Sequence, residues 1–437
     1  MLETLRKAFK VVDVRKKLLF TFLMLVVIRI GSQLPTPGVD PTYIQSFFDN
    51  QAGDAFNFFD AFTGGSFTSM SVFALSITPY ITSSIIMQLL TIVFPKLEEM
   101  QRDGEDGRKK IVAITRYVTI GLALTQSTAL AVGFGRQGLL VEYNFVNVVI
   151  VVLTLTAGSA FLMWIGERIT ERGVGNGISI VLLINIISSI PQDFTMLFDQ
   201  FVIGKSIAKA GLALLIIIAI VILMVVFVII LQDGQRRIPV QYAQKMQGRK
   251  SVGGQSTYIP MKINTAGVIP IIFASSLMQF PVVIASFLGK GQEGIAATIL
   301  NGFNSNNWLN PSKIQYSWGL IVYIALVVFF AYFYTSITFN PIEIANNMKK
   351  RGGFVPGIRP GKPTVDFITS ILNYVVFIGA VGLVIIQVIP FFFNGMFGAQ
   401  VSFGGTSLII IVSVVLESIK QIESQLLVRN YTGFLNK

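Results

Sequence analysis

Ten long apolar blocks constrain the fold of this chain more than any other feature of its sequence. A helix needs about 20 mostly apolar residues to cross a bilayer core about 30 Å thick. Only 13% of the residues are charged, about half the usual share. The pattern predicts an all-α polytopic membrane protein, with blocks at roughly 18–34, 71–94, 111–133, 145–166, 175–190, 211–231, 263–288, 317–339, 366–390 and 406–422.

The residue types that are missing exclude several functions. The chain contains no Cys and no His, so it has no disulfide framework, no thiolate nucleophile, no imidazole base and no Cys/His metal site. The HExxH and GxSxG motifs are also missing. We therefore expect no enzyme, no metal and no cofactor.

The positive charge is concentrated in alternate connections between the blocks. The N-terminal segment, the connections after blocks 2, 4, 6 and 8, and the C-terminal tail together hold 27 of the 34 Lys and Arg residues. The other connections hold five, and Arg29 and Arg116 lie inside blocks near the membrane interfaces. Because Lys and Arg mark cytoplasmic loops, both termini are predicted to face the cytoplasm, as ten spans require.

The blocks divide the chain into four segments: an amphipathic cytoplasmic segment (1–17), two halves of five blocks each (18–200 and 201–422) and a cytoplasmic tail (423–437). The first outer connection contains the sequence AFNFFDAFTGGSFTSM, which is apolar but too short to span a bilayer. It is either an interfacial helix or a segment that folds back into the protein, where its Phe side chains find cover.

Two long basic loops, 232–262 and 340–363, extend on the predicted cytoplasmic side. Their Gly and Pro residues favour turns over long helices, although RRIPVQYA alternates as a hairpin strand would. The bases fit a role in fixing topology, but loops this long exceed what topology needs. They also suit an acidic protein surface or an RNA backbone, and the residues leave those two open.

A short internal repeat relates the two halves. PYITSSIIMQ (79–88) and PIIFASSLMQ (270–279) share Pro, Ile, Ser, Met and Gln at equivalent places, and Pro79 falls near the middle of its block. Five spans per half give the halves opposite orientations. In such inverted repeats, paired spans interrupted by Pro or Gly line the working site.

The middle of each predicted span lacks acidic residues. Ion-coupled transporters keep ionisable groups at that depth, so this pattern does not favour one. The central spans carry Ile, hydroxyls and amides instead. Ile77 and Ile81 share a helix face, as do Ile178 and Leu182. Such pairs fit ordinary packing, but they also fit an apolar constriction that excludes water and ions.

Seven ordered motifs resemble the SecY/Sec61-alpha family, the channel-forming subunits of Sec protein translocases. They cover nearly the whole chain and read RIGSQLPTPGVD (29–40), FTGGSFTSMSVFALSITPYITSSIIMQLL (62–90), GERITERGVGNGISI (166–180), GQRRIPVQYA (234–243), QSTYIPMKINTAGVIPIIFASS (255–276), NPIEIANNMKKRGGFVPGIRPGKPT (340–364) and FGGTSLIIIV (403–412). The resemblance implies ten transmembrane helices in two inverted, pseudo-symmetric halves around a central pore.

The resemblance also implies roles for particular residues. The pore ring falls on Ile77, Ile81, Ile178, Leu182, Ile272 and Ile410. The plug falls on about 55–70, with Phe58, Phe59, Phe62, Gly64, Gly65 and Phe67. The lateral gate falls on Thr82, Gln126, Ser276 and Phe280. The docking surface for a motor or the ribosome falls on Arg236, Arg237, Arg249, Lys250 and Arg359.

The implied function is a protein-conducting channel in the bacterial plasma membrane that exports unfolded polypeptides and releases membrane helices sideways. The implied partners are SecE, SecG, the SecA ATPase, the ribosome, signal sequences, translocating polypeptides and membrane lipids. The alternative is an inverted-repeat secondary transporter of a small solute, which would need a midplane charge or ion site.

Overall fold

The computed structural model describes residue 6, residue 42 and the ranges 9–40, 62–203, 207–242, 245–247, 250–252, 256–288, 294–397 and 404–435. In this part of the chain each of the ten predicted blocks coincides with one helix. These helices are α2 (Val12–Gly31), α5 (Thr78–Val93), α7 (Glu105–Phe134), α8 (Phe145–Arg172), α9 (Gly177–Phe201), α10 (Ile207–Asp233), α11 (Ile269–Leu288), α13 (Trp318–Thr338), α15 (Lys362–Phe397) and α16 (Gly405–Leu435).

Among the described residues, seven helices are long and apolar enough to cross a membrane, or eight if α5 and α6 (Pro95–Arg102) count as one span bent by 107°. α2 carries several charges in its first turns. The apolar part of α11 counted by that test, Ile269–Met278, is short. Length and hydropathy therefore identify seven or eight of the ten predicted spans among the described residues.

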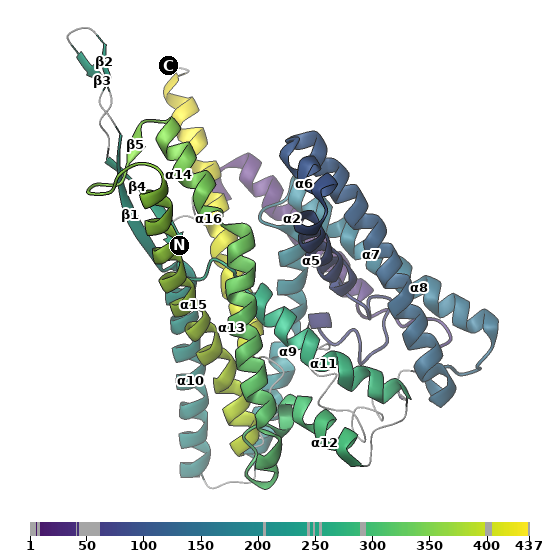
Figure 1. Ribbon diagram of the computed structural model, residues 1–437. Coiled ribbons are helices and arrows are strands. Elements are labelled where there is room, and N and C mark those ends of the chain that lie inside the picture. Colours follow the sequence, from purple (N-terminus) through teal and green to yellow (C-terminus); the bar gives the residue numbers. More distant parts are fainter. Residues whose placement is uncertain are drawn as a thin grey trace.

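The two halves of the chain lie side by side (Figure 1). α5, α7 and α8 of the first half stand on the right of the view, and α10, α13 and α15 of the second half stand on the left. α9 of the first half packs against α16 of the second. This contact brings the end of the first half and the end of the chain together at the centre of the molecule.

The basic connections gather at one end of the helices. In Figure 1, α6, α14 (Pro341–Lys350) and the strands lie towards the top with the C-terminal end of α16, whereas α12 (Gly294–Phe303) lies at the opposite end. The alternation of charge along the sequence thus corresponds to a separation in space.

A small sheet joins the two long basic loops. β1 (Gln235–Tyr242) pairs antiparallel with β4 (Ser256–Lys262), which confirms the predicted strand in RRIPVQYA. β1 also pairs with β5 (Gly353–Phe354) from the second loop, and β2 (Lys245–Gln247) pairs with β3 (Lys250–Val252) in a separate hairpin. The loops therefore form one platform, which the separate patterns of the two loops did not predict.

Several helices differ in extent from their blocks. α2 starts at Val12, inside the predicted N-terminal segment 1–17. α9 continues to Phe201 past Pro191, and the Asn176 side chain caps its start by accepting a hydrogen bond from the Ile178 amide at 3.1 Å. The glycine-rich GVGNG segment ends where this helix begins.

Candidate functional site

The two repeat segments begin their helices in the same way. Thr78 and Ile269 each start a helix whose second residue is the repeat proline. A proline is tolerated in the first turn, where its missing N–H has no partner to lose, but not in a helix interior. The first part of each predicted span is consequently unwound, so Pro79 opens a helix and does not interrupt one.

The backbone of the two turns matches residue by residue. The Ile77 carbonyl accepts hydrogen bonds from the amides of Tyr80 and Ile81, both at 3.1 Å. The Val268 carbonyl, at the equivalent place, likewise accepts from the amides of residues 271 and 272, both at 3.2 Å. The residues just before, Ser76 and Gly267, have φ of 51° and 66°. This likeness supports the repeat that the sequence indicates.

A single apolar cluster, here called the central cluster, collects five of the six predicted pore-ring positions. Its buried members come from α2, α8, α9, α16 and the segment before α5, and include Ile77 (0% exposed), Leu182 (8%) and Ile410 (2%). Ile81 and Ile178 are half-buried and pack against it. The structure therefore brings these five side chains into one apolar region.

The sixth predicted position differs from the others. Ile272 on α11 is half-buried and lies outside the central cluster. Val268, one turn earlier, packs against the central cluster and also against the core of the second half. Sequence reasoning missed Val268, although it is the repeat equivalent of Ile77 and the alignment could have found it.

The described part of the predicted plug, residues 62–70, is called here the plug segment; Phe58 and Phe59 lie outside the described residues. Phe62 is a buried member of the central cluster, whereas Phe67 packs in a second cluster with side chains of α7 and α8. Gly64 and Gly65 have φ of 65° and 80°, which glycine adopts without steric cost. The segment thus folds back into the protein, as the second of the two sequence interpretations states.

Four polar side chains that the sequence did not single out contact this segment. Asn185 Nδ2 donates to the Phe62 carbonyl at 3.3 Å and to Ser76 Oγ at 2.9 Å. Arg29 Nη1 donates to Ser188 Oγ at 2.9 Å and to the Gly64 carbonyl at 3.4 Å. The partners come from α2, α9 and the turn before α5, so no local sequence pattern links them.

The predicted gate residues lie on three helices. Thr82 is on α5, Gln126 on α7, and Ser276 and Phe280 on α11. The Thr82 hydroxyl donates to the Thr78 carbonyl of its own helix at 3.1 Å. A contact between the halves comes from Tyr334 of α13, whose hydroxyl donates to Gln88 Oε1 of α5 at 3.4 Å.

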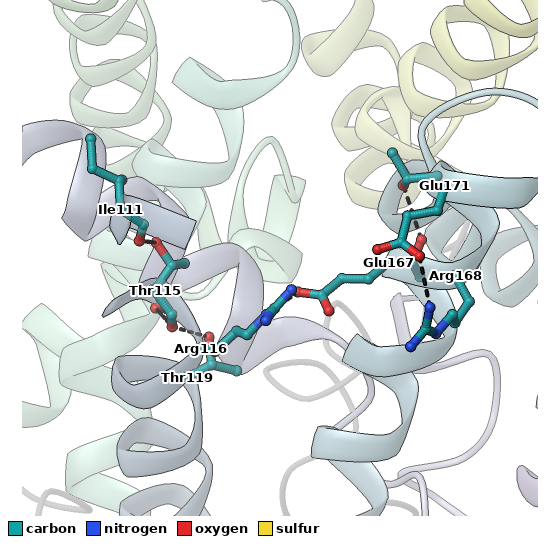
Figure 2. A network of polar contacts seen from close by, with 10 residues as sticks. Ile111, Thr115, Arg116, Thr119, Glu167, Arg168 and Glu171 are labelled. Carbon is teal, nitrogen blue, oxygen red and sulfur yellow. Dashed lines mark hydrogen bonds and ion pairs between the residues drawn. The ribbon is translucent and has the colours of Figure 1, made fainter. Parts of the chain in front are cut away.

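Polar contacts tie α5, α7 and α8 together. Figure 2 shows Arg116 of α7 reaching across to Glu167 of α8, with 2.6 Å between Nε and Oε1. The Thr115 carbonyl, one residue earlier on α7, accepts from Ser83 Oγ of α5 at 2.8 Å and from Thr119 Oγ1 at 2.7 Å. These bonds make the three helices one unit beside the central cluster.

Four of the five predicted docking bases lie in the described parts of the two basic loops. Arg236 and Arg237 are exposed on β1, and the Arg237 guanidinium stacks 4.8 Å from the centre of the Tyr258 ring. Arg359 is exposed in a turn between Gly357 and Gly361, which have φ of 80° and 111°. Lys250 begins β3, and Arg249 lies outside the described residues.

The site has the chemistry of a seal. Ile, Leu and Val side chains meet at its centre, and within the described residues no cluster of Asp and Glu could hold a metal ion. Such a surface excludes water and ions without recognising a particular side-chain sequence.

Comparison with known proteins gives one consistent family. The SecY family model matches residues 71–419. A protein translocase subunit SecY of Corynebacterium glutamicum is 42% identical, covering 98% of this chain and 99% of the relative. A SecY of Streptomyces scabiei is 44% identical and covers both chains fully.

Solved structures with low sequence identity share the fold. A protein-conducting channel superimposes with a TM-score of 0.62 at 18% identity, covering 94% of this chain and 92% of that chain. A SecY structure described in terms of a plug domain that stabilises the closed state gives 0.62 at 19% identity with the same coverage. Sec61 in a canine ribosome–channel complex gives 0.60 at 19% identity, again with that coverage.

Proposed function

Because the chain belongs to the SecY family of protein translocase subunits, we propose that it conducts unfolded secretory polypeptides across a membrane and releases membrane-protein helices sideways. The membership confirms the resemblance in the sequence and the all-α polytopic fold class, and it argues against an enzyme and against a small-solute transporter. The observation that carries the proposal is the central cluster, in which predicted ring positions and Phe62 of the plug segment meet.

The pore ring of Ile77, Ile81, Ile178, Leu182, Ile272 and Ile410 seals the resting channel and closes around a passing chain. Apolar side chains suit this task because they repel water and ions in the empty state. They also make no specific hydrogen bonds that would hold one cargo.

The lateral gate lies between α5 and α7 of the first half (18–200) and α11 and α13 of the second half (201–422). An apolar signal sequence enters there, partitions towards lipid and displaces the plug. Thr82, Gln126, Ser276 and Phe280 line its path, and the Tyr334–Gln88 contact is consistent with a seam that opens.

The platform faces the cytoplasm of a bacterial cell, with both termini on the same side and the protein in the plasma membrane. The spatial gathering of basic loops supports this orientation. The exposed arginines of the platform dock the SecA ATPase or the ribosome. SecE and SecG complete the complex. The driving force comes from these partners, because GVGNG is too short for a P-loop and lacks its Lys.

A cysteine capture experiment tests the channel directly. The chain has no native Cys, so Ile81→Cys provides a unique thiol at the ring. A secretory polypeptide stalled during export and carrying one cysteine is expected to form a disulfide with it. A matched thiol on the outer face of α10, Leu223→Cys, where the side chain is 63% exposed, should capture nothing. Capture at neither position, with uptake of a small solute, would refute the proposal.

Arg359→Glu tests the docking surface. The reversed charge should abolish motor-driven export, because an acidic partner surface would be repelled. The exposed position should leave folding unchanged. Lys313→Glu, an exposed reversal outside the platform, is the control. Normal export by the Arg359→Glu variant would remove this residue from the docking surface.

A further inference from the structure

We propose that a polar latch, formed by Arg29, Ser76, Asn185 and Ser188, holds the plug segment against α9 in the resting channel and sets how readily the plug leaves. This inference rests on the proposed function and adds a named restraint on the plug. The latch is separate from the apolar ring, because its contacts with the plug segment are hydrogen bonds to the main-chain carbonyls of Phe62 and Gly64.

The latch grips carbonyl groups and not side chains of the plug segment. Asn185 and Arg29 donate to the carbonyls of Phe62 and Gly64, two residues apart. Ser188 Oγ lies between them, accepting from Arg29 at 2.9 Å and donating to the Asn185 carbonyl at 2.7 Å. A latch of this kind depends on the path of the backbone, so it tolerates changes in plug side chains.

Gly64 allows the close approach that the latch requires. A Cβ atom at this position would lie 2.6 Å from the Asn185 carbonyl oxygen and 2.6 Å from Ser188 Oγ. Its φ of 65° also turns the chain in a way that other residues resist. Plug and α9 therefore touch backbone to backbone at the latch.

Burial of the latch residues makes their hydrogen bonds costly to break in the closed state. Asn185 is 3% exposed and Ser76 is 1% exposed. If the plug leaves while the site stays dry, the amide of Asn185 loses its Phe62 partner, and an unsatisfied buried donor is costly. When water enters an open pore it can replace that bond. The latch thus favours closure in the dry state and yields once the channel is wet.

The test uses thiol labelling as a measure of plug release. Ser66 is 1% exposed, so Ser66→Cys places the single thiol of the chain where a water-soluble maleimide reaches it only after the plug undocks. Without cargo, adding Asn185→Leu should raise the labelling rate about tenfold, the factor that loss of one buried hydrogen bond implies. Leu has a similar shape but no donor.

Two further variants make the result decisive. Ser76→Gly removes a latch hydroxyl and relieves the strain of a positive φ. It should therefore speed labelling without lowering the melting temperature. This variant tests the latch even if Asn185→Leu fails to fold. Ser189→Ala is the control, because Ser189 bonds the Ile186 carbonyl of its own helix at 2.9 Å. Its labelling rate should equal that of Ser66→Cys alone.

Labelling rates for Asn185→Leu and Ser76→Gly equal to that of the Ser189→Ala control would overturn the latch. Failure of the proposed function would look different: a signal peptide would neither accelerate labelling of the Ser66→Cys protein nor open an ion conductance in vesicles that contain it. The latch predicts faster labelling in the variants even before any signal peptide is added.

Discussion

The two halves meet along two seams that differ in character. At the rear seam, α9 packs on α16: Val181 and Ile410 are buried together in the central cluster, and the Gly175 amide donates to Gln421 Oε1. At the front seam, the described contact is the 3.4 Å bond from Tyr334 to Gln88, which is exposed. Among the described residues, α5 and α7 approach α11 and α13 sparsely.

This difference indicates which seam holds and which opens. Dry apolar packing between α9 and α16 resists separation, because parting the helices would expose that surface. A long hydrogen bond at an exposed position adds little. We therefore expect the rear seam to act as the hinge and the front seam to separate first.

Locking the front seam should have the largest effect. Cysteines in place of Gln88 and Tyr334, joined by a cleavable bifunctional crosslinker, are expected to block export and lateral release almost completely, because the halves could no longer part there. Cleavage of the linker should restore activity in a vesicle transport assay. Each single-cysteine variant is the control, and full activity of the crosslinked protein would contradict the comparison.

A larger residue in the rear seam should lower the free energy of unfolding. Gly175 has φ of 80°, and a Cβ there would lie 2.7 Å from Ser418 Oγ of α16. We expect Gly175→Ala to lower the free energy of unfolding by about 3–4 kcal/mol, combining backbone strain with the clash.

Gly357→Ala is the control for that crowding. Its φ of 80° equals that of Gly175, but a Cβ there meets nothing within 4 Å. A loss of about 1–2 kcal/mol is expected from the strain alone. Thermal unfolding in detergent measures both, and equal losses would mean that the rear seam yields easily.

Truncating one ring residue from each side compares how tightly the two sides of the pore are packed. Ile410 is 2% exposed in the central cluster, whereas Ile272 is half-buried outside it. Ile410→Ala should destabilise by about 2–3 kcal/mol through the cavity left behind, and Ile272→Ala should cost about 1 kcal/mol. Denaturation in detergent gives both values, and a reversed order would show that Ile272 is packed more tightly than Ile410.

Removal of the front contact should have the smallest effect. Tyr334→Phe deletes the hydroxyl that donates to Gln88 and keeps the ring. A change of about 0.5 kcal/mol or less in unfolding free energy is expected, with a slight rise in signal-peptide-activated conductance. A loss as large as that of Gly175→Ala would show that the front seam is as tight as the rear.

The sequence predicted the elements whose signal is local. Long apolar blocks located the helices, and alternation in RRIPVQYA identified β1, because both patterns depend on neighbouring residues. The Pro-aligned repeat predicted a pair of equivalent spans interrupted at their prolines. It did not place the prolines at the first turn, since hydropathy continues through the unwound residues before each helix.

Contacts between distant residues were beyond local patterns. β5 is two residues long and pairs with β1 from another loop, so neither loop alone indicates the platform. Asn185 and Ser188 resemble ordinary polar residues of a membrane helix in the sequence. Their significance comes from Arg29 and the plug segment, which the fold brings to them.

Ser76 and Gly267 show how the inverted repeat loses its symmetry. Both residues occupy the same turn with positive φ, where glycine is the unstrained choice. The second half uses glycine there, whereas the first half accepts the strain of serine and gains a hydroxyl bonded to Asn185. The same backbone turn thus has two roles. In the second half it only precedes a helix, whereas in the first half its serine hydroxyl also belongs to the proposed latch on the plug segment.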